Sequence, residues 1–218
     1  MPYFNIVAET NENTVVTEYE PVKKRSDSYQ SEAELEQEFI RLLCEQGYEY
    51  LSIHTEKDLI ANLRKKLEEL NNYQFSDTEW EDFFKNAVAN PNEHIVEKTR
   101  KIQENNVQVL TRDDGSSKNI TLIDKKNIHN NRLQVINQYA ISMDNGAKYN
   151  NRYDVTVLVN GLPLVHIELK RRGVSIREAF NQINRYQRES FWAGYGLYEY
   201  SDFCYFKWYS YKVLFQQH

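Results

Sequence analysis

The sequence has only two cysteines, Cys44 and Cys204, which lie far apart along the chain. Two cysteines are too few for a disulfide scaffold, and they do not have metal-ligand spacing. We therefore expect both to be reduced thiols that serve as packing residues. The sequence also lacks an apolar run of roughly 18 residues, the length of a membrane span, and its N-terminus lacks a basic segment followed by an apolar one. These absences favour a cytoplasmic protein with no membrane partner.

The chain also lacks an overall positive charge, since 27 Lys and Arg residues stand against 32 Asp and Glu residues. Nucleic-acid binders usually show a basic excess or a basic patch. No stretch fits the G-x-x-x-x-G-K-[ST] phosphate loop, which argues against nucleotide hydrolysis by this chain. Its 218 residues, 40% of them hydrophobic and 27% charged, indicate an α/β protein with one sizeable core.

Helical and strand patterns follow one another along the chain. Residues 1–28 are polar and irregular and are interpreted as an N-terminal arm. The predicted elements are a helix from Ser31 to Gly47, a short strand over 48–53, a helical insertion over about 55–104 with starts near Ser76 or Asp77 and at Pro91, a hairpin around Asp114-Gly115, an extended segment over 132–143, two strands between 146 and 170, and a helix capped by Ser175. We place one main domain at 29–200.

The stretch "VLVNGLPLVHIELKRRG", residues 157–173, predicts a hairpin whose second strand carries Glu168 and Lys170. Because side chains alternate faces along a strand, the register decides which groups meet. A two-residue Asn160-Gly161 loop would pair Asp154 with Ile167. A three-residue loop centred on Gly161 would set Asp154 opposite Glu168, and we favour it because it also gathers the valines on one face.

Two carboxylates about 5 Å apart between backbones repel each other unless a cation lies between them. Hard oxygen ligands favour Mg²⁺ or Mn²⁺, and a bound metal supports phosphodiester cleavage by activating water. Lys170 lies two residues past Glu168, on the same face, where it could stabilise the transition state. The competing interpretation is a surface ion cluster of Asp154, Glu168 and Lys170 that protects an edge strand. His166, between Val165 and Ile167, is expected to be a packed strand residue.

A local basic segment follows the hairpin on this acidic chain. It contains six positive residues against Glu178 alone: Lys170, Arg171, Arg172, Arg177, Arg185 and Arg188. These residues are candidates for DNA contacts, although a solvated helix face would have a similar composition.

The stretch "YDVTVLVNGLPLVHIELKRRG" followed by "AFNQINRYQRESFWAG" resembles the N-terminal nuclease domain of the restriction (R, motor) subunit of type I restriction-modification enzymes. These belong to the PD-(D/E)xK superfamily, RecB-like branch. The resemblance implies a restriction-endonuclease-like α/β core with a mixed central sheet flanked by helices. It also implies that Asp154 and Glu168 are metal ligands and that Lys170 is the catalytic lysine. Tyr153 stands where the superfamily name has proline.

The resemblance assigns further site residues outside the hairpin. A Gln-x-x-x-Tyr motif on the following helix maps onto Gln182 and Tyr186, one helical turn apart. The helix "EAELEQEFIRLLCEQGYEYL" resembles the family's opening, whose acidic residue approaches the metal. Glu36 is the candidate there, with Glu32 and Glu38 as rivals, and any of the three could instead be a solvent-exposed helix residue.

The resemblance ends near Tyr200, and the tail over 201–218 shows neither clean alternation nor a cap. In a neighbouring reading frame, back-translated with A- and T-ending codons, this tail would read as a strand, an Asn-Gly turn and a second strand. We therefore hypothesise a frameshift and a truncated subunit without its motor domains. ATP would be needed only by those absent domains.

The resemblance implies magnesium-dependent cleavage of double-stranded DNA, with modification (M) and specificity (S) subunits as partners in the full enzyme. One alternative is a non-catalytic fragment that docks on DNA or on partner subunits. Another is a standalone repair or mobile-element nuclease of the same superfamily, which would act without ATP or partners.

Overall fold

The computed structural model describes residues 4–9, 14–19, 31–141, 151–170, 181, 197, 200, 202–207 and 211–216. Its elements, in chain order, are β1 (Phe4–Glu9), β2 (Thr14–Tyr19), α1 (Glu32–Glu45), β3 (Glu49–Tyr50), α2 (Glu56–Asn71), α3 (Asp77–Phe83), the π-helical turn η1 (Phe84–Val88), α4 (Ile95–Gln103), β4 (Val107–Thr111), β5 (Ser117–Thr121), the 3-10 turn η2 (Ile128–Asn130), β6 (Leu133–Ile141), β7 (Asn151–Val159), β8 (Leu162–Lys170), β9 (Asp202–Lys207) and β10 (Tyr211–Gln216). No helix in these ranges is long and apolar enough to cross a membrane.

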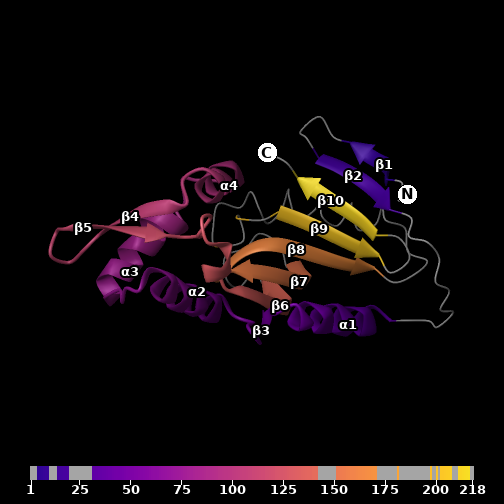
Figure 1. Ribbon diagram of the computed structural model, residues 1–218, viewed down its shortest axis with the longest axis horizontal. Helices are drawn as coiled ribbons and strands as arrows, with labels where there is room; N and C mark the ends of the chain where they lie inside the picture. The colour runs from indigo at the N-terminus through magenta and orange to yellow at the C-terminus, as the bar shows by residue number, and fades with distance from the viewer. Residues whose placement is uncertain are drawn as a thin grey trace.

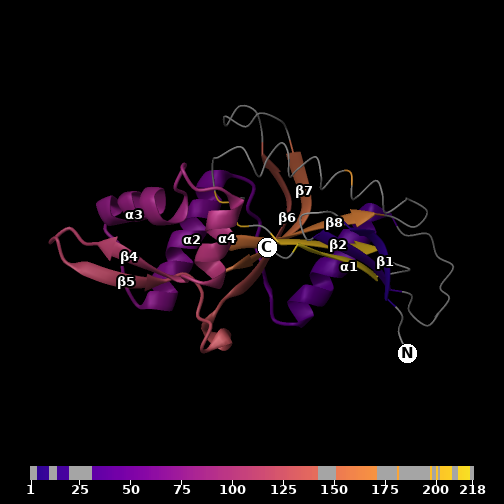
Figure 2. The same cartoon turned by 90° about the horizontal axis from the view of Figure 1, so that it is seen from above.

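A mixed five-stranded sheet forms the centre of the molecule, in the order β3-β6-β7-β8-β9 (Figure 1). Strands β6, β7 and β8 are antiparallel, whereas β3 runs parallel to β6 and β9 runs parallel to β8. Helices flank this sheet, with α1 along one face and α2 at one end (Figure 2). This arrangement confirms the predicted α/β class with a mixed central sheet.

Helix α1 begins where the sequence predicts. Ser31 accepts a hydrogen bond from the backbone N–H of Glu34, and the Glu34 side chain accepts one from the Ser31 N–H. The last helical residue is Glu45, Gln46 is the C-cap, and Gly47 follows with φ +94°. Cys44 is a free thiol, but it is exposed, so the expectation that it packs in the core is wrong.

The block between β3 and β6 carries the predicted helices. Ser76 caps α3 as expected, but α4 starts at Ile95, because His94 and not Pro91 takes the N-cap position. Strand β3 is also shorter than predicted, with only two residues. The apolar side of α2 packs in one core with the β4–β5 hairpin and the central sheet. The block and the sheet therefore share their interior.

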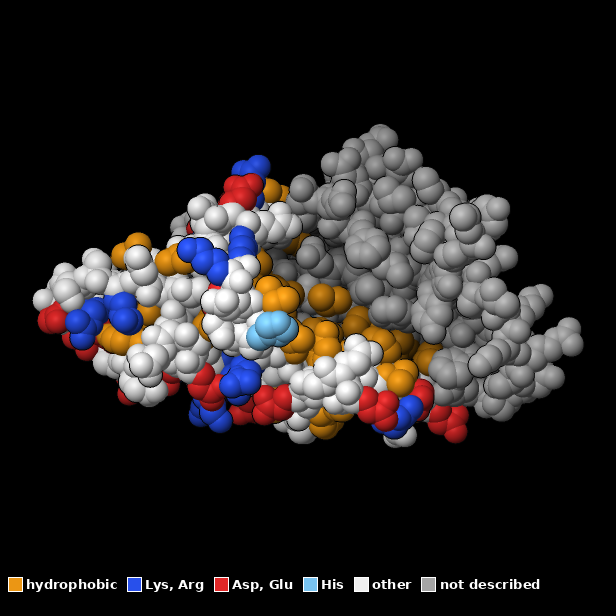
Figure 3. All heavy atoms as spheres, in the orientation of Figure 1, with side chains coloured by type: hydrophobic (Ala, Val, Ile, Leu, Met, Phe, Trp, Pro, Cys, Tyr) orange, Lys and Arg blue, Asp and Glu red, His pale blue; other side chains and the backbone are white. Residues whose placement is uncertain are grey.

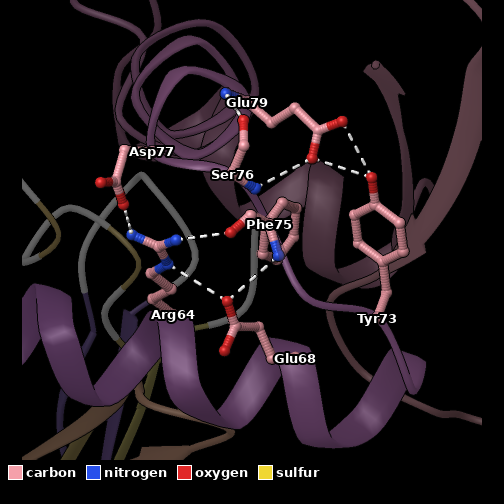
Figure 4. A network of polar contacts seen from close by, with 7 residues as sticks. All are labelled: Arg64, Glu68, Tyr73, Phe75, Ser76, Asp77 and Glu79. Carbon is pink, nitrogen blue, oxygen red and sulfur yellow. Dashed lines mark hydrogen bonds and ion pairs between the residues drawn. The ribbon is translucent and has the colours of Figure 1, made fainter. Parts of the chain in front are cut away.

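A polar network fixes the turn between α2 and α3 (Figure 4). The Arg64 guanidinium donates to the carbonyl of Phe75 at 2.6 Å and to Asp77 at 2.8 Å. Glu68 accepts from both Arg64 and the Phe75 backbone N–H, at 3.1 and 3.2 Å. These bonds tie the turn to α2 and so orient the start of α3.

The two ends of the chain meet in a second sheet. Strands β1 and β2 form an antiparallel hairpin, and β10 pairs with the other edge of β2. The polar N-terminal arm and the tail over 201–218, whose patterns did not predict regular structure, thus contain β1, β2, β9 and β10.

Candidate metal and nuclease site

The β7–β8 hairpin turns through two residues, so the expected three-residue loop is wrong. Asn160 and Gly161 both have positive φ, +52° and +85°, as a type I′ turn requires. The pairs next to the turn are Val159 with Leu162 and Leu158 with Pro163.

A β-bulge then restores the register that the sequence favoured. The pairing shifts by one residue after Leu158, so that Val157 faces Val165 and Val155 faces Ile167. The pairing between the strands extends to Val155 and Ile167, and continuing it by one residue would bring Asp154 level with Glu168. The predicted register is therefore reached by a two-residue turn plus a bulge.

The two turn residues are held tightly. The Asn160 side chain is fully buried, donates to the Leu122 carbonyl at 3.0 Å and to Asn131 at 2.8 Å, and accepts from the Arg132 backbone N–H at 2.8 Å. Gly161 lies against α2, where a Cβ atom would stand 2.6 Å from the Leu63 Cα. The insertion thus touches the turn of the hairpin that carries the candidate site.

The two faces of the hairpin differ in chemistry as expected. Val155, Val157, Ile167 and Leu169 pack beneath α1 with Leu35. On the opposite face, the Thr156 hydroxyl and His166 Nδ1 are hydrogen bonded at 2.9 Å, and both residues are buried. His166 is therefore a packed strand residue, as predicted.

Three candidate residues lie together at the open end of the hairpin. The Asp154 carboxylate accepts a hydrogen bond from the backbone N–H of Leu169 at 2.9 Å, between Glu168 and Lys170. Glu168 is only 2% exposed, and the Lys170 ammonium lies 3.4 Å from its Oε2. An acid with this little exposure does not fit the alternative of a solvated surface ion cluster.

The donor set suits a divalent cation. Among the described residues no group of three or more His, Cys, Asp or Glu side chains forms a cluster that could hold a metal. Two carboxylates are nevertheless sufficient for Mg²⁺, which commonly binds one or two protein carboxylates and keeps several waters. Asp154 and Glu168 supply hard oxygens of this kind.

Glu36 lies on α1 and points to the central sheet. It is 9% exposed, and its carboxylate accepts hydrogen bonds from the side-chain amides of Asn137, at 2.6 Å, and Gln138 on β6. Its rivals differ: Glu32 is exposed, and Glu38 pairs with Arg41 on the helix surface at 2.7 Å. Of the three acids, Glu36 alone is buried toward the sheet.

The predicted site residues that follow the hairpin lie outside the described residues. These are Gln182, Tyr186, Arg171, Arg172, Arg177, Arg185 and Arg188. Of the predicted basic segment only Lys170 is described, and it contacts Glu168.

The sequence reasoning missed a distortion at the level of Asp154. Gln138 has φ +52°, which is unusual for a residue with a side chain. On β6, Ile136 and Tyr139 lie in the same core, although strict alternation would place them on opposite faces. On β7, Tyr153 stacks on His166 on one face of the sheet, whereas Val155, two residues later, packs on the face under α1. Both strands thus reverse their alternation here. The two adjacent amides of Asn137 and Gln138 in the middle of the strand were the available signal.

Burial also changes the chemistry of His166. It is 1% exposed, and desolvation lowers its pKa from 6.5 to about 3. The ring is therefore neutral at physiological pH and contributes no charge to the neighbouring carboxylates.

A mixed α/β sheet flanked by helices, with two carboxylates and a lysine gathered on one hairpin, defines a protein compatible with the restriction-endonuclease fold. Comparison with known families makes the assignment specific. The chain belongs to the family described as "Type I restriction enzyme R protein N terminus", whose model matches residues 29–207 and so includes β9.

Similar proteins named as type I restriction enzyme endonuclease subunits occur in several bacteria. The chain is 48% identical over 195 residues to the type I restriction enzyme EcoprrI endonuclease subunit of Escherichia coli, covering 89% of this chain and 61% of that protein. It is 39% identical over 168 residues to the SsaAORF53P endonuclease subunit of Staphylococcus saprophyticus, covering 75% of this chain and 17% of that protein. It is 29% identical over 181 residues to the HindI endonuclease subunit of Haemophilus influenzae, covering 73% of this chain and 17% of that protein. The chain therefore spans only part of each of these relatives.

Proposed function

We propose that this chain is the nuclease module of a type I restriction R subunit and cleaves double-stranded DNA phosphodiester bonds in the cytoplasm with Mg²⁺ or Mn²⁺. The observation that carries the proposal is the hydrogen bond of the Asp154 carboxylate to the Leu169 N–H, next to the buried Glu168, on a hairpin of a chain that belongs to this family. Modification and specificity subunits are the proposed partners, and ATP would serve only motor domains.

Each residue of the site has a proposed role. Asp154 and Glu168 hold the cation, which when bound would supply a water of lowered pKa and neutralise charge on the phosphate. The hydrogen bond from the Leu169 N–H fixes the Asp154 carboxylate. Lys170, held near Glu168, stabilises negative charge that develops on the phosphate.

Residues beyond the described part complete the proposal. Gln182 and Tyr186 are proposed to contact the substrate or steady the site. Lys170 and the arginines at 171, 172, 177, 185 and 188 would bind the DNA backbone, which requires positive charge that the acidic chain otherwise lacks.

The test compares Asp154→Ala with Asp82→Ala, an exposed aspartate on α3. Calorimetric titration of Mn²⁺ should show binding to the wild type and to Asp82→Ala but not to Asp154→Ala. In a full-length R subunit that carries this module, with M and S subunits and ATP, Asp154→Ala should abolish DNA cleavage and leave assembly intact. Cleavage by Asp154→Ala at the wild-type rate would overturn the proposal.

A further inference from the structure

The distortion at Asp154 originates in β6. The ladder between β6 and β7 pairs Asn137 with Val155 and Tyr139 with Tyr153, and the level between these pairs belongs to Gln138 and Asp154. Gln138 is left-handed there, with φ +52°. A glutamine in this conformation is unfavourable unless its surroundings hold it.

Glu36 provides that support. Its carboxylate accepts from the amides of Asn137 and Gln138, two consecutive residues that strict alternation would point to opposite faces. The Asn137 amide is oriented by a second contact, because its Oδ1 accepts from the Tyr50 hydroxyl at 2.9 Å. One buried acid thus holds the left-handed turn of β6 through hydrogen bonds to two consecutive residues.

The turn has a consequence on the neighbouring strand. Asp154 stands opposite Gln138, at the point where β7 reverses its own alternation. Its carboxylate accepts the backbone N–H of Leu169, so the side chain is directed along the sheet toward β8. The Asp154 carboxylate thereby lies at the peptide that joins Glu168 and Leu169.

We propose that Glu36 is a positioning residue of the nuclease site: through Asn137 and Gln138 it holds the left-handed turn of β6 that directs Asp154 toward Glu168. It acts through the backbone and does not bind the metal. This inference rests on the proposed function, and it assigns Glu36 a different role from the metal ligand that the family resemblance implied.

A positioning residue and a metal ligand differ in one testable respect. If Glu36 only supports the left-handed turn, a glycine at position 138 should make that support unnecessary. Glycine adopts positive φ without support. Gln138→Gly should therefore keep the turn when Glu36 is removed, whereas no backbone change at 138 can replace a lost metal ligand.

The experiment compares the wild-type chain with Glu36→Ala, Gln138→Gly and the double variant, with Glu38→Ala as the matched surface control on α1. The first readout is hydrogen-exchange protection of the Leu169 amide, referenced to Val157, and it needs no metal. The second is Mn²⁺ affinity by calorimetry. Glu36→Ala should lower both by about 10-fold or more, the usual effect of losing a residue that orients a ligand. The double variant should recover both, and Glu38→Ala should change neither.

Recovery of Leu169 protection without recovery of Mn²⁺ affinity would overturn the proposal in favour of direct metal binding by Glu36. Unchanged protection in Glu36→Ala would also overturn it. If the wild type binds no Mn²⁺, the proposed metal site fails, and Leu169 protection still decides whether Glu36 sets the strand geometry. If Glu36→Ala does not fold, Gln138→Val provides the test, because a β-branched residue disfavours positive φ; it should lose Leu169 protection, and retained protection would contradict the proposal.

Discussion

At the scale of single residues, the candidate site adjoins a row of buried polar and aromatic side chains on β7 and β8. Thr156 bonds to His166, Tyr153 stacks on the His166 ring at 4.7 Å, and Glu168 continues the same face of β8. A neutral histidine in this position packs like an aromatic residue. A protonated one would place an uncompensated charge in the core.

The buried histidine predicts an acid-labile fold. Its pKa is about 3 in the folded chain and 6.5 as the reference for the unfolded chain, so the unfolded state binds the extra proton between these values. Stability is therefore lost as the pH falls from 6.5 toward 3. We expect His166 to lower the free energy of unfolding by about 1.4 kcal/mol at pH 5.5 relative to pH 7.5.

Urea denaturation at the two pH values measures this loss. His166→Gln should remove the contribution of about 1.4 kcal/mol from the pH dependence, whereas replacement of the exposed His129 should leave the dependence as it is. An unchanged pH dependence in His166→Gln would contradict the assignment.

At the scale of elements, the β7–β8 turn connects the candidate site with the helical insertion. Gly161 has φ +85°, and a Cβ atom at this position would point at the backbone of Leu63 on α2. Gly115, in the β4–β5 turn, has a similar φ of +79°, but a Cβ atom added there would have no neighbour within 4 Å. The two glycines therefore separate backbone strain from steric contact.

Gly161→Ala should destabilise the chain much more than Gly115→Ala. Both changes place alanine at positive φ, which costs about 1–2 kcal/mol. Only Gly161→Ala also forces α2 away from the hairpin, so we expect a total of about 3 kcal/mol or more there. Thermal and urea unfolding of both variants measure the difference, and equal losses would show that the contact with Leu63 yields without cost.

The helices and strands were predicted from the sequence more accurately than the bulge and the loop that connect the strands of the site. The caps at Ser31 and Ser76 and the Asp114-Gly115 turn follow from local chemistry. The bulge between the Leu158–Pro163 and Val157–Val165 pairs could not be predicted from local chemistry. It adjoins a turn whose Asn160 and Gly161 pack against segments distant in sequence. The register that pairs Val157 with Val165 and Val155 with Ile167 was predicted from the valine pattern, although the loop that was thought to produce it is different.

At the scale of the whole molecule, the insertion and the sheet share one interior. Leu59, Leu63 and Leu67 of α2 belong to the same buried cluster as Ile136 of β6 and Leu158 of β7. Figure 3 shows apolar side chains exposed over the central part of the described surface, with charged groups mainly around them. The helical insertion therefore contributes side chains to the main hydrophobic core.

This shared core predicts cooperative unfolding. The amides of Leu63 on α2 and Val157 on β7 should exchange with solvent hydrogen at the same free energy of opening, within about 0.5 kcal/mol, because both open only in global unfolding. Native-state hydrogen exchange across a urea series measures both. An opening energy for Leu63 lower by about 2 kcal/mol would show that the insertion unfolds separately.

The parallel pairing of β3 with β6 closes a long loop, and this has a consequence for changes in the length of the chain between the two strands. The Glu49 and Gln134 side chains bond across 85 positions of sequence. The entropy of closing such a loop grows only with the logarithm of its length, so doubling it costs about 0.6 kcal/mol. Loop closure alone thus sets little limit on the length of chain between these strands. The limit comes from the shared core, to which α2, α3 and α4 all contribute buried side chains, and from the turn at Gly161, which rests on α2.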